Sequence, residues 1–229
     1  MQISEKNNKS IGFKILISFP LILVLYFIMI QYNFVGVLSA SIQEPRSLKT
    51  IVDDWIPFIP WFLIPYLLWT LFPFAGLIFS IRKKITAINI FSLYIAHMLL
   101  VLLCFVIYLV FPTTAASVMV DTSLFDNNLI PSMGALQKLY NASVPYNAFP
   151  SYHVAALVFL SIFLYHKWRL LFWITLPVSV LSSIATVFVR FHFSVDILGG
   201  IAMGIFAYYI LYEKVATKII KKFVQVRVN

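Results

Sequence analysis

The chain has 229 residues, of which 62% are hydrophobic, 17% aromatic and only 11% charged. This composition lies far outside the range of soluble domains, so the sequence predicts an integral membrane protein. The single cysteine, Cys104, excludes both a disulfide framework and a cysteine metal cluster within the chain.

Six long apolar segments follow one another along the chain, and each is expected to cross the bilayer. Open sheet edges are not tolerated in lipid, and the runs are longer than barrel strands, so the segments are predicted to be helices. A span needs roughly 20 apolar residues, so the short fourth segment is expected to borrow residues 149–153 or its far flank. The predicted fold is an all-α membrane bundle that forms a single domain over residues 1–229. The six predicted spans are Ile15–Val37, Ile56–Ile81, Ile85–Phe111, Val154–Tyr165, Leu170–Val189 and Ile197–Tyr212.

The first of these segments has some features of a secretory signal peptide, with lysines before it and small residues at Leu38–Ser41. Its apolar run is about twice the roughly 7–15 residues of a signal-peptide core. A retained first span is therefore predicted.

Six spans place successive connections alternately on the two sides of the membrane. The basic residues divide unevenly between these two sides. Thirteen of the 17 Lys and Arg residues share one side with both termini, whereas the other side holds four, together with six of the eight acids. The positive-inside rule predicts that the first side, with both termini, is cytoplasmic. The net charge of +9 therefore reflects membrane orientation, and no nucleic-acid partner is predicted. The four basic residues on the other side are Arg46, Lys49, Lys138 and Arg190.

The longest polar connection covers residues 112–150 and is predicted to be an extracytoplasmic loop that leads into the active site. Connections of more than about 15 residues are usually functional or disordered. Tyr140, Tyr146 and four prolines in this stretch favour a structured loop.

Two polar motifs stand where predicted spans begin on this outer side. The first, "NAFPSYHVAA", contains Ser151 and His153, and the second, "VRFHFSVDILGG", contains His192 and Asp196. His192 and Asp196 are four residues apart and share a helix face. A carboxylate that accepts from one ring nitrogen leaves the lone pair of the other nitrogen free to attack. Ser151 marks a helix start, where a hydroxyl and free backbone N–H groups can bind an anion such as phosphate.

With the motifs "PSYH" and "HFSVD", the chain resembles the phosphatidic acid phosphatase type 2 superfamily, and Asp53–Tyr66 resembles the start of the second span in a bacterial branch. The resemblance implies a six-helix membrane enzyme that needs no metal or cofactor and works through a phosphohistidine. It implies that His192 is the nucleophile and that Asp196 orients it. It also implies that His153 is the general acid and that Ser151 binds phosphate.

The sequence departs from the phosphatases of this superfamily at the phosphate-binding cations. Thr186 stands where they usually carry an arginine, six residues before the nucleophilic histidine, and their first motif, a lysine followed seven residues later by Arg-Pro, has no clear counterpart. Arg190 and Lys138 are expected to substitute as phosphate ligands, with Lys49 and Arg46 as further candidates. The phosphotransferase branch, which includes enzymes that make inositol phosphorylceramide and sphingomyelin, often lacks the arginine too.

Three further features have mainly structural interpretations. Gly200 and Gly204 are spaced for a close helix contact in the sixth span. His97 lies in the middle of the third span, where a functional role is open but a hydrogen bond between helices is the favoured interpretation. Asp53 and Asp54 are interpreted as an N-cap and a first-turn acid at the start of the second span.

The sequence thus predicts a lipid-phosphate phosphatase at the extracytoplasmic face of the cell membrane. Alternatives are a phosphotransferase that moves a phospho-head group to a lipid alcohol, and a decayed member that binds or transports lipid phosphates. A further alternative uses His153, His192 and Asp196 as a two-His-one-carboxylate metal site. The sequence selects neither the lipid phosphate nor the oligomeric state.

Overall fold

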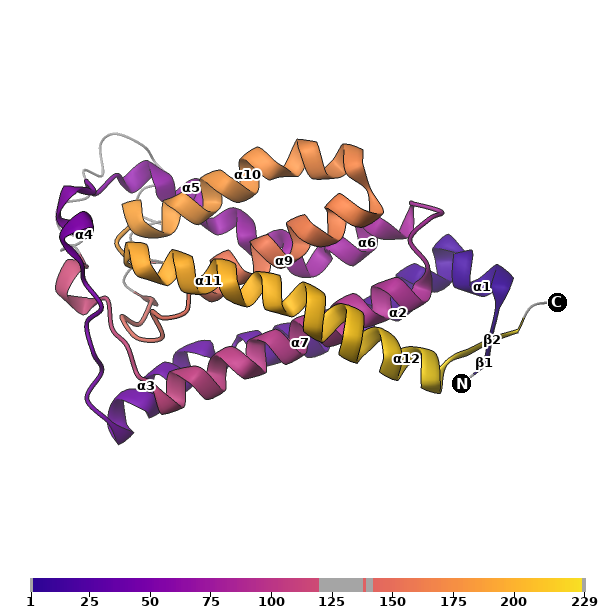
Figure 1. The fold of residues 1–229 in the computed structure, drawn as a ribbon, viewed down its shortest axis with the longest axis horizontal. Coiled ribbons are helices and arrows are strands. Elements are labelled where there is room, and N and C mark those ends of the chain that lie inside the picture. The colour runs from indigo at the N-terminus through magenta and orange to yellow at the C-terminus, as the bar shows by residue number, and fades with distance from the viewer. Residues whose placement is uncertain (1, 120–137, 139–141, 228–229) are drawn as a thin grey trace.

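The computed structural model describes residues 2–119, 138 and 142–227, so the predicted loop over residues 112–150 falls partly outside the described residues. The elements within these ranges are helices, apart from one pair of three-residue strands, and the predicted all-α class is confirmed. Figure 1 shows the long helices running side by side along the molecule. The helices are α1 (Glu5–Lys9), α2 (Ile11–Met29), α3 (Tyr32–Ile42), α4 (Ile51–Trp55), η1 (Pro60–Phe62), α5 (Leu63–Leu67), η2 (Leu68–Phe74), α6 (Ala75–Ser80), α7 (Ala87–Val110), η3 (Ala116–Val118), α9 (Tyr152–Lys167), α10 (Arg169–Phe188), α11 (Ser194–Phe206), η5 (Ala207–Ala216) and α12 (Thr217–Phe223).

Five helical stretches of the described chain are long and apolar enough to cross a membrane. The predicted fourth span is α9, which has 16 residues and begins at Tyr152, within the flank from which this span was expected to borrow. A helix of that length is about 24 Å long, shorter than the roughly 30 Å hydrocarbon core. A sixth crossing therefore stays a prediction. The five stretches are Ile11–Ile42, Pro60–Ser80, Ala87–Val110, Arg169–Phe188 and Ser194–Phe223.

The stretch Pro60–Ser80 is an irregular helix in which 3₁₀ turns alternate with short α-helical segments. Pro65 and Pro73 each remove a backbone donor, which prevents continuous α-helical hydrogen bonding. The Tyr94 hydroxyl of α7 donates to the carbonyl of Pro73 at 2.6 Å and so satisfies one backbone group in this segment. The predicted second span is therefore not one continuous α-helix.

The termini and the basic turns gather at one end of the bundle. Strands β1 (Gln2–Ser4) and β2 (Gln225–Arg227) pair in parallel, which places the two ends of the chain side by side (Figure 1). The buried Lys14 donates to the carbonyls of Arg82 and Ile85 at 3.1 and 3.0 Å, and the Arg82 guanidinium lies 5.5 Å from the centre of the Trp168 ring. These contacts bring the α6–α7 and α9–α10 turns to the α2 end. The side of the membrane that this end faces stays a prediction.

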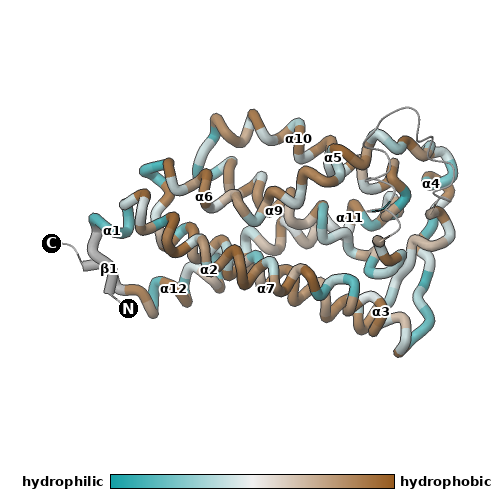
Figure 2. The backbone as a smooth tube through the Cα atoms, turned by 180° about the vertical axis from the view of Figure 1, so that it is seen from behind, coloured by the Kyte–Doolittle hydropathy of each residue, from teal (hydrophilic) through white to brown (hydrophobic). Residues whose placement is uncertain are grey.

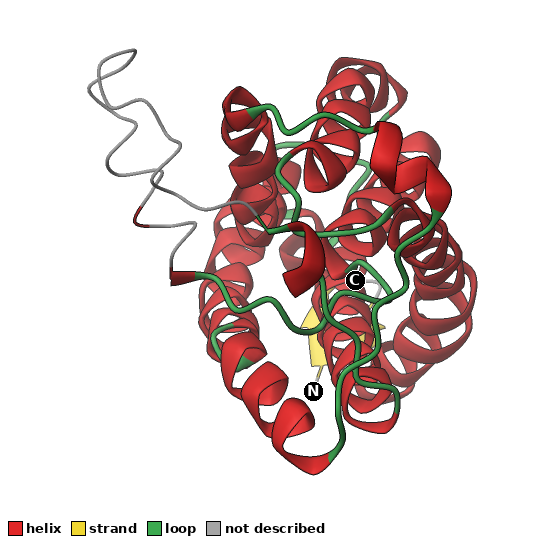
Figure 3. Ribbon diagram, turned by 90° about the vertical axis from the view of Figure 1, so that its left-hand side faces the viewer, coloured by secondary structure: helices red, strands yellow, loops and turns green. Residues whose placement is uncertain are grey.

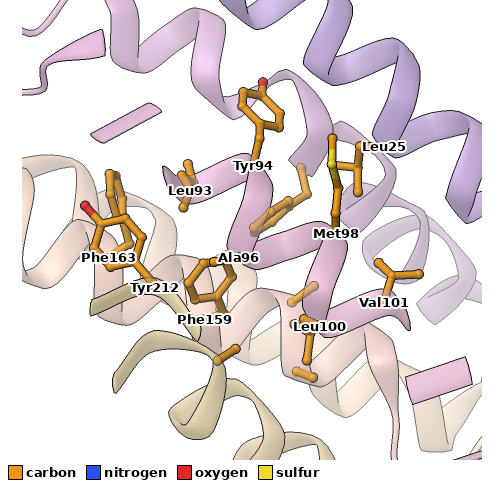
Figure 4. Close-up of a cluster of buried hydrophobic side chains, with 14 of the residues drawn as sticks. Leu25, Leu93, Tyr94, Ala96, Met98, Leu100, Val101, Phe159, Phe163 and Tyr212 are labelled. Atoms are coloured by element: carbon orange, nitrogen blue, oxygen red, sulfur yellow. The ribbon is translucent and has the colours of Figure 1, made fainter. Parts of the chain in front are cut away.

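Helix α7 lies at the centre of the apolar core. Figure 4 shows its side chains Leu93, Ala96 and Leu100 among residues of α2, α9 and η5. The outer surfaces of the long helices also expose large apolar side chains, such as Phe27 and Trp173 at 66% and 60%. Figure 2 shows hydrophobic residues along the helices and hydrophilic residues gathered toward both ends. An apolar exterior of this extent is typical of a protein whose solvent is lipid, and the chain is a membrane protein.

Helices α9 and α11 approach each other closely at two glycines. A Cβ atom added to Gly200 would lie 2.6 Å from the carbonyl oxygen of Ser151, and one added to Gly204 would lie 2.6 Å from that of Ala155. These distances are shorter than van der Waals contact, so the absence of a side chain permits the approach. The close contact predicted for the Gly200 and Gly204 pair is confirmed.

We expect Gly200→Ala to destabilise the protein by about 1–3 kcal/mol, because the added methyl group meets backbone rather than a movable side chain. The measurement is the midpoint of thermal unfolding in detergent. Gly12→Ala is the matched control, since a Cβ atom at Gly12 meets nothing within 4 Å, and alanine suits a helix better than glycine. Equal midpoints for the two variants would contradict this account of the contact.

Candidate active site

The two polar motifs meet at the end of the bundle opposite the termini, onto which Figure 3 looks. The backbone N–H of Ser151, the N-cap of α9, donates to the carbonyl of Asp196 in α11 at 3.1 Å. The rings of His153 and His192 lie with their centres 5.6 Å apart and their planes at 71°. Both histidines are buried, with 6% and 4% of their surface exposed. The structure therefore brings together the two histidines that the sequence singled out.

His192 is oriented mainly by a backbone carbonyl. Its Nδ1 lies 2.8 Å from the carbonyl oxygen of Ala148 and 3.4 Å from Oδ2 of Asp196. A carbonyl can only accept, so this contact assigns the proton to Nδ1 and leaves the lone pair on Nε2. The sequence named Asp196 as the orienting partner, but Ala148 is the nearer acceptor. The Asp196 carboxylate instead accepts from the backbone N–H of Phe193 at 2.8 Å and places a negative charge beside the ring.

Left-handed backbone conformations occur at Asn147 and Arg190, in the two segments that form this contact. An L-residue pays roughly 1–2 kcal/mol for such a conformation, although asparagine tolerates it better than most residues. Asn147 (φ 62°) is held by reciprocal bonds with α3, because its side-chain amide donates to the carbonyl of Tyr32 and the Tyr32 hydroxyl donates back to its carbonyl. These two hydrogen bonds fix Asn147 and so position the backbone carbonyl of the next residue, Ala148.

Arg190 has a left-handed backbone conformation (φ 60°) and lies in the turn that follows the end of α10 at Phe188. The backbone N–H of Phe191 donates to the carbonyl of Thr186 and that of Arg190 to the carbonyl of Val187, both at 3.1 Å, a pairing typical of helix C-termini with a left-handed residue. The Arg190 guanidinium donates to the carbonyl of Ile56 at 3.0 Å, and its Nε is buried without a partner in the described chain. Arg190 and His192 share a small void of about 10 Å³. The guanidinium thus lies near the histidine without entering the main cavity.

His153 is held by aromatic side chains. The ring of Tyr66 lies 4.7 Å from its centre, and the ring of Trp69 lies 4.4 Å away, nearly perpendicular. Its Nδ1 is buried and has no hydrogen-bond partner in the described chain. Both aromatic residues come from the irregular stretch Pro60–Ser80, and neither was flagged by the sequence analysis. The cluster of prolines and aromatics in "PWFLIPYLLWT" was the available signal.

Both histidines line a cavity of about 450 Å³. Ser151 is not part of its wall, because its fully buried hydroxyl accepts from the backbone N–H of Val154 at 3.5 Å as the helix cap. Lys138 is exposed and does not line the cavity either. Of the six residues expected to form the site, the structure brings His153, His192, Asp196 and Arg190 close together. Neither Ser151 nor Lys138 is in the wall of the cavity.

Asp53 links the segment before the second span to the start of α11. Its carboxylate accepts from the backbone N–H of Ser194 at 2.7 Å and from the backbone N–H and hydroxyl of Thr50 at 2.7 and 2.8 Å. Burial alone would raise the pKa of Asp53, but the hydrogen bonds from Ser194 and Thr50 hold it below its ordinary value. Asp53 lies in the first turn of the short helix α4, where it forms a capping box with Thr50, and not at the start of the stretch Pro60–Ser80, so the predicted place at the start of the second span is corrected. The bond to Ser194 was not foreseen, because it joins residues 141 positions apart.

Two alternatives from the sequence can be compared with these contacts. Within the described ranges, no group of three His, Cys, Asp or Glu side chains is placed to hold a metal ion. A metal site built from His153, His192 and Asp196 therefore receives no support. His97 is buried in α7 and shares a hydrogen bond with the Tyr152 hydroxyl of α9, which confirms the predicted hydrogen bond between helices.

Comparison with known proteins identifies a family. The family model described as the PAP2 superfamily matches residues 42–210, a range that contains both polar motifs and the helices from α4 to α11. No curated protein and no solved structure matches the chain significantly.

We expect Asp53→Asn to destabilise the protein by about 1–3 kcal/mol at pH 7, because buried N–H groups lose a charged acceptor. A carboxylate with a lowered folded pKa contributes stability above its ordinary pKa and loses it as the pH falls through the folded value. The difference in unfolding midpoint between the wild type and the variant should therefore shrink from pH 7 toward pH 3. Asp54→Asn is the control, because that carboxylate is 56% exposed and pairs with Lys49 at the surface. An equal effect of the two substitutions would contradict the role of Asp53.

Proposed function

The chain belongs to the PAP2 superfamily, and from this membership we propose that it is a lipid-phosphate phosphatase that works through a phosphohistidine at the extracytoplasmic face of the cell membrane. Membership supports a function of the phosphatase or phosphotransferase type. The finer proposal is carried by one observation: two buried histidines share a cavity, and one of them has its Nδ1 occupied by a backbone carbonyl.

His192 is assigned as the nucleophile. Because its Nδ1–H is bonded to Ala148, the lone pair on Nε2 is the one available to attack phosphorus. The attack forms the N–P bond and breaks the bond from phosphorus to the lipid alcohol. The ring becomes positively charged, and the Asp196 carboxylate 3.4 Å from Nδ1 stabilises that charge.

His153 is assigned as the general acid. It gives a proton to the departing alkoxide oxygen, and in the second step it takes a proton from the water that attacks the phosphohistidine. The second attack breaks the N–P bond and releases phosphate. The contacts with Tyr66 and Trp69 hold the ring facing His192 while these protons move.

The lipid is proposed to reach the cavity from the bilayer. Ile30, between α2 and α3, lines the cavity and is 63% exposed, and the nearby Phe27 and Phe34 are 66% and 64% exposed. This apolar surface suits acyl or prenyl chains that remain in the membrane while the head group enters. Arg190 is proposed as a phosphate ligand beside His192, because its buried Nε has no partner in the described chain while another nitrogen of the guanidinium donates to the carbonyl of Ile56.

A second candidate is a phosphotransferase that passes the phospho-head group to a lipid alcohol. It is favoured by Thr186, whose side chain is fully buried and donates to the carbonyl of Ser183 where the related phosphatases carry a phosphate-binding arginine. Release of phosphate into water supports the phosphatase, and a labelled lipid product formed only with an added alcohol supports the transferase. A decayed binding or transport protein would bind the lipid and form neither product.

The roles of the two histidines can be separated with two leaving groups. His192→Ala should abolish turnover of every substrate and remove the acid-labile phosphoenzyme, because the nucleophile is gone. His153→Ala should slow a lipid monoester by about 10²–10⁴-fold but affect p-nitrophenyl phosphate much less, since phenolate needs little protonation. Steady-state kinetics and acid-quenched labelling provide the measurements. A phosphoenzyme that survives in His192→Ala and disappears in His153→Ala would reverse the assignment.

The outer location of the site can be tested by cysteine labelling in intact cells. A membrane-impermeant thiol reagent should modify Glu44→Cys, in the exposed segment before α4, and should not modify Lys83→Cys, in the exposed turn before α7. The buried Cys104 provides the unlabelled background in the wild type. Labelling with the opposite sidedness would place the site at the cytoplasmic face.

A further inference from the structure

A second cavity, of about 550 Å³, lies between α9, α10 and the stretch formed by α11 and η5. Figure 1 shows α10 and α11 separating from the turn that joins them, with α9 between them. Among the described residues, none lines both this cavity and the cavity of the histidines. The neighbours His153 and Val154 illustrate the division, because each lines a different cavity. We call the second cavity the α9 groove, and it is separate from the site of the proposed reaction.

Small side chains of α10 leave this groove open. Ser179 and Ser183 line it one helical turn apart. The Ser183 hydroxyl donates to the carbonyl of Ser179 at 2.8 Å, so it is satisfied within its own helix and requires no polar ligand. Val180 and Ile184, which also line the groove, are 49% and 40% exposed, so the groove opens onto the outer surface of the bundle. At this position the surrounding solvent is lipid, which suits an apolar ligand.

The floor of the groove is long enough for an acyl chain. It follows α9 from Val154 to His166, a rise of about 18 Å. One leaflet occupies half of the roughly 30 Å hydrocarbon core. A lipid chain that begins near His166 would therefore lie along most of the floor.

The groove ends at a cationic turn. Lys167 and Arg169 flank the turn between α9 and α10, and the Arg169 guanidinium lies 3.7 Å from the centre of the Tyr165 ring, which lines the groove. No carboxylate of the described chain forms an ion pair with either cation. Glu213 also lies toward this end, where it accepts from the Tyr208 hydroxyl at 3.0 Å. The two cations therefore remain available to an anion.

This turn lies at the end of the bundle that carries the termini, because the Arg82 guanidinium lies over the ring of Trp168. The positive-inside rule predicts that this end is cytoplasmic. Anionic lipids give the cytoplasmic leaflet its negative surface potential. The groove thus combines an apolar channel for a chain with two cations at the depth where an anionic head group would lie.

We propose that the α9 groove binds an anionic phospholipid, with one acyl chain along α9 and the phosphate of the head group at Lys167 and Arg169. The charge of this turn selects the head group, because a zwitterionic phospholipid with the same chains gains little from two cations. The bound chain fills the space between α10 and α11 and so stabilises the folded bundle. The proposal goes beyond the proposed function, since this lipid is not the substrate.

The test compares two lipids that differ in head-group charge. Full-length protein in a maltoside detergent is titrated with dimyristoyl phosphatidylglycerol or dimyristoyl phosphatidylcholine, and native mass spectrometry measures the bound fraction. The anionic lipid should bind about 5- to 30-fold more tightly, because one or two cations contribute to its binding.

A matched pair of double variants locates the head group. Lys167→Gln with Arg169→Gln should remove most of the preference for phosphatidylglycerol. Lys221→Gln with Lys222→Gln is the control, because it removes the same charge from exposed residues of α12 at the same end of the bundle. The control should keep the preference.

A second matched pair locates the chain. Val180→Trp places a large ring in the groove and should weaken the binding of both lipids at least 5-fold. Val178→Trp makes the same substitution in α10 at a residue that is 44% exposed and outside the groove wall, and it should leave binding unchanged. If Val180→Trp does not fold, the two lipids and the double variants still decide.

Three results would overturn the proposal. Equal affinity for the two lipids would show that the head-group charge is not recognised. Unchanged binding in Val180→Trp would place the lipid elsewhere, for example in the cavity of the histidines. An equal loss of preference in the two double variants would show attraction to the general positive charge of this end. Binding is measured without turnover, so a protein that releases no phosphate would end the proposed function and leave this result standing.

Discussion

The contact between α9 and α11 is the constraint on which the candidate site depends. Gly200 lets the carbonyl of Ser151 approach α11, and the Ser151 N–H then reaches the carbonyl of Asp196 at 3.1 Å. Both helices begin near this contact, so their first turns, which carry His153 and Asp196, are fixed relative to each other. Small residues at helix interfaces are especially useful in membranes, where packing rather than water exclusion drives association. The contact of the two helix starts thus fixes His153 and Asp196 relative to each other, whereas His192 lies in the turn between α10 and α11 and is oriented by the carbonyl of Ala148.

A second constraint is that polar groups away from water must find partners. Lys14 is fully buried and donates to two carbonyls of the α6–α7 turn, and Asp53 accepts from backbone N–H groups at two helix starts. In each case a charged side chain satisfies the main chain where a helix begins or ends. Arg190 does the same for the carbonyl of Ile56. Several of the ionic groups near the helix ends are thus used for structure, and the cavity wall retains histidines and aromatic rings.

The sequence predicted the parts of the molecule that depend on local pattern. The all-α class follows from long apolar runs, and the approach of the two motifs follows from placing both at the same ends of their spans. The partners of the histidines could not be predicted, because they come from distant segments. The Ala148 carbonyl reaches His192 from 44 residues away, and Tyr66 and Trp69 contact His153 from the irregular second span. Lys138 was chosen for its charge alone, and charge does not fix where an exposed side chain lies.

Arg190 combines a backbone role with a side-chain role that glycine could not fill. A glycine would adopt φ 60° without the roughly 1–2 kcal/mol that an L-residue pays. The arginine instead ties the end of α10 to Ile56, at the start of the second span, and so connects the His192 segment to the stretch that carries Tyr66. Its Nε is buried and lacks a partner in the described chain. A phosphate oxygen bound at His192 would supply that partner, so substrate binding and the geometry of the second span would be coupled through one guanidinium.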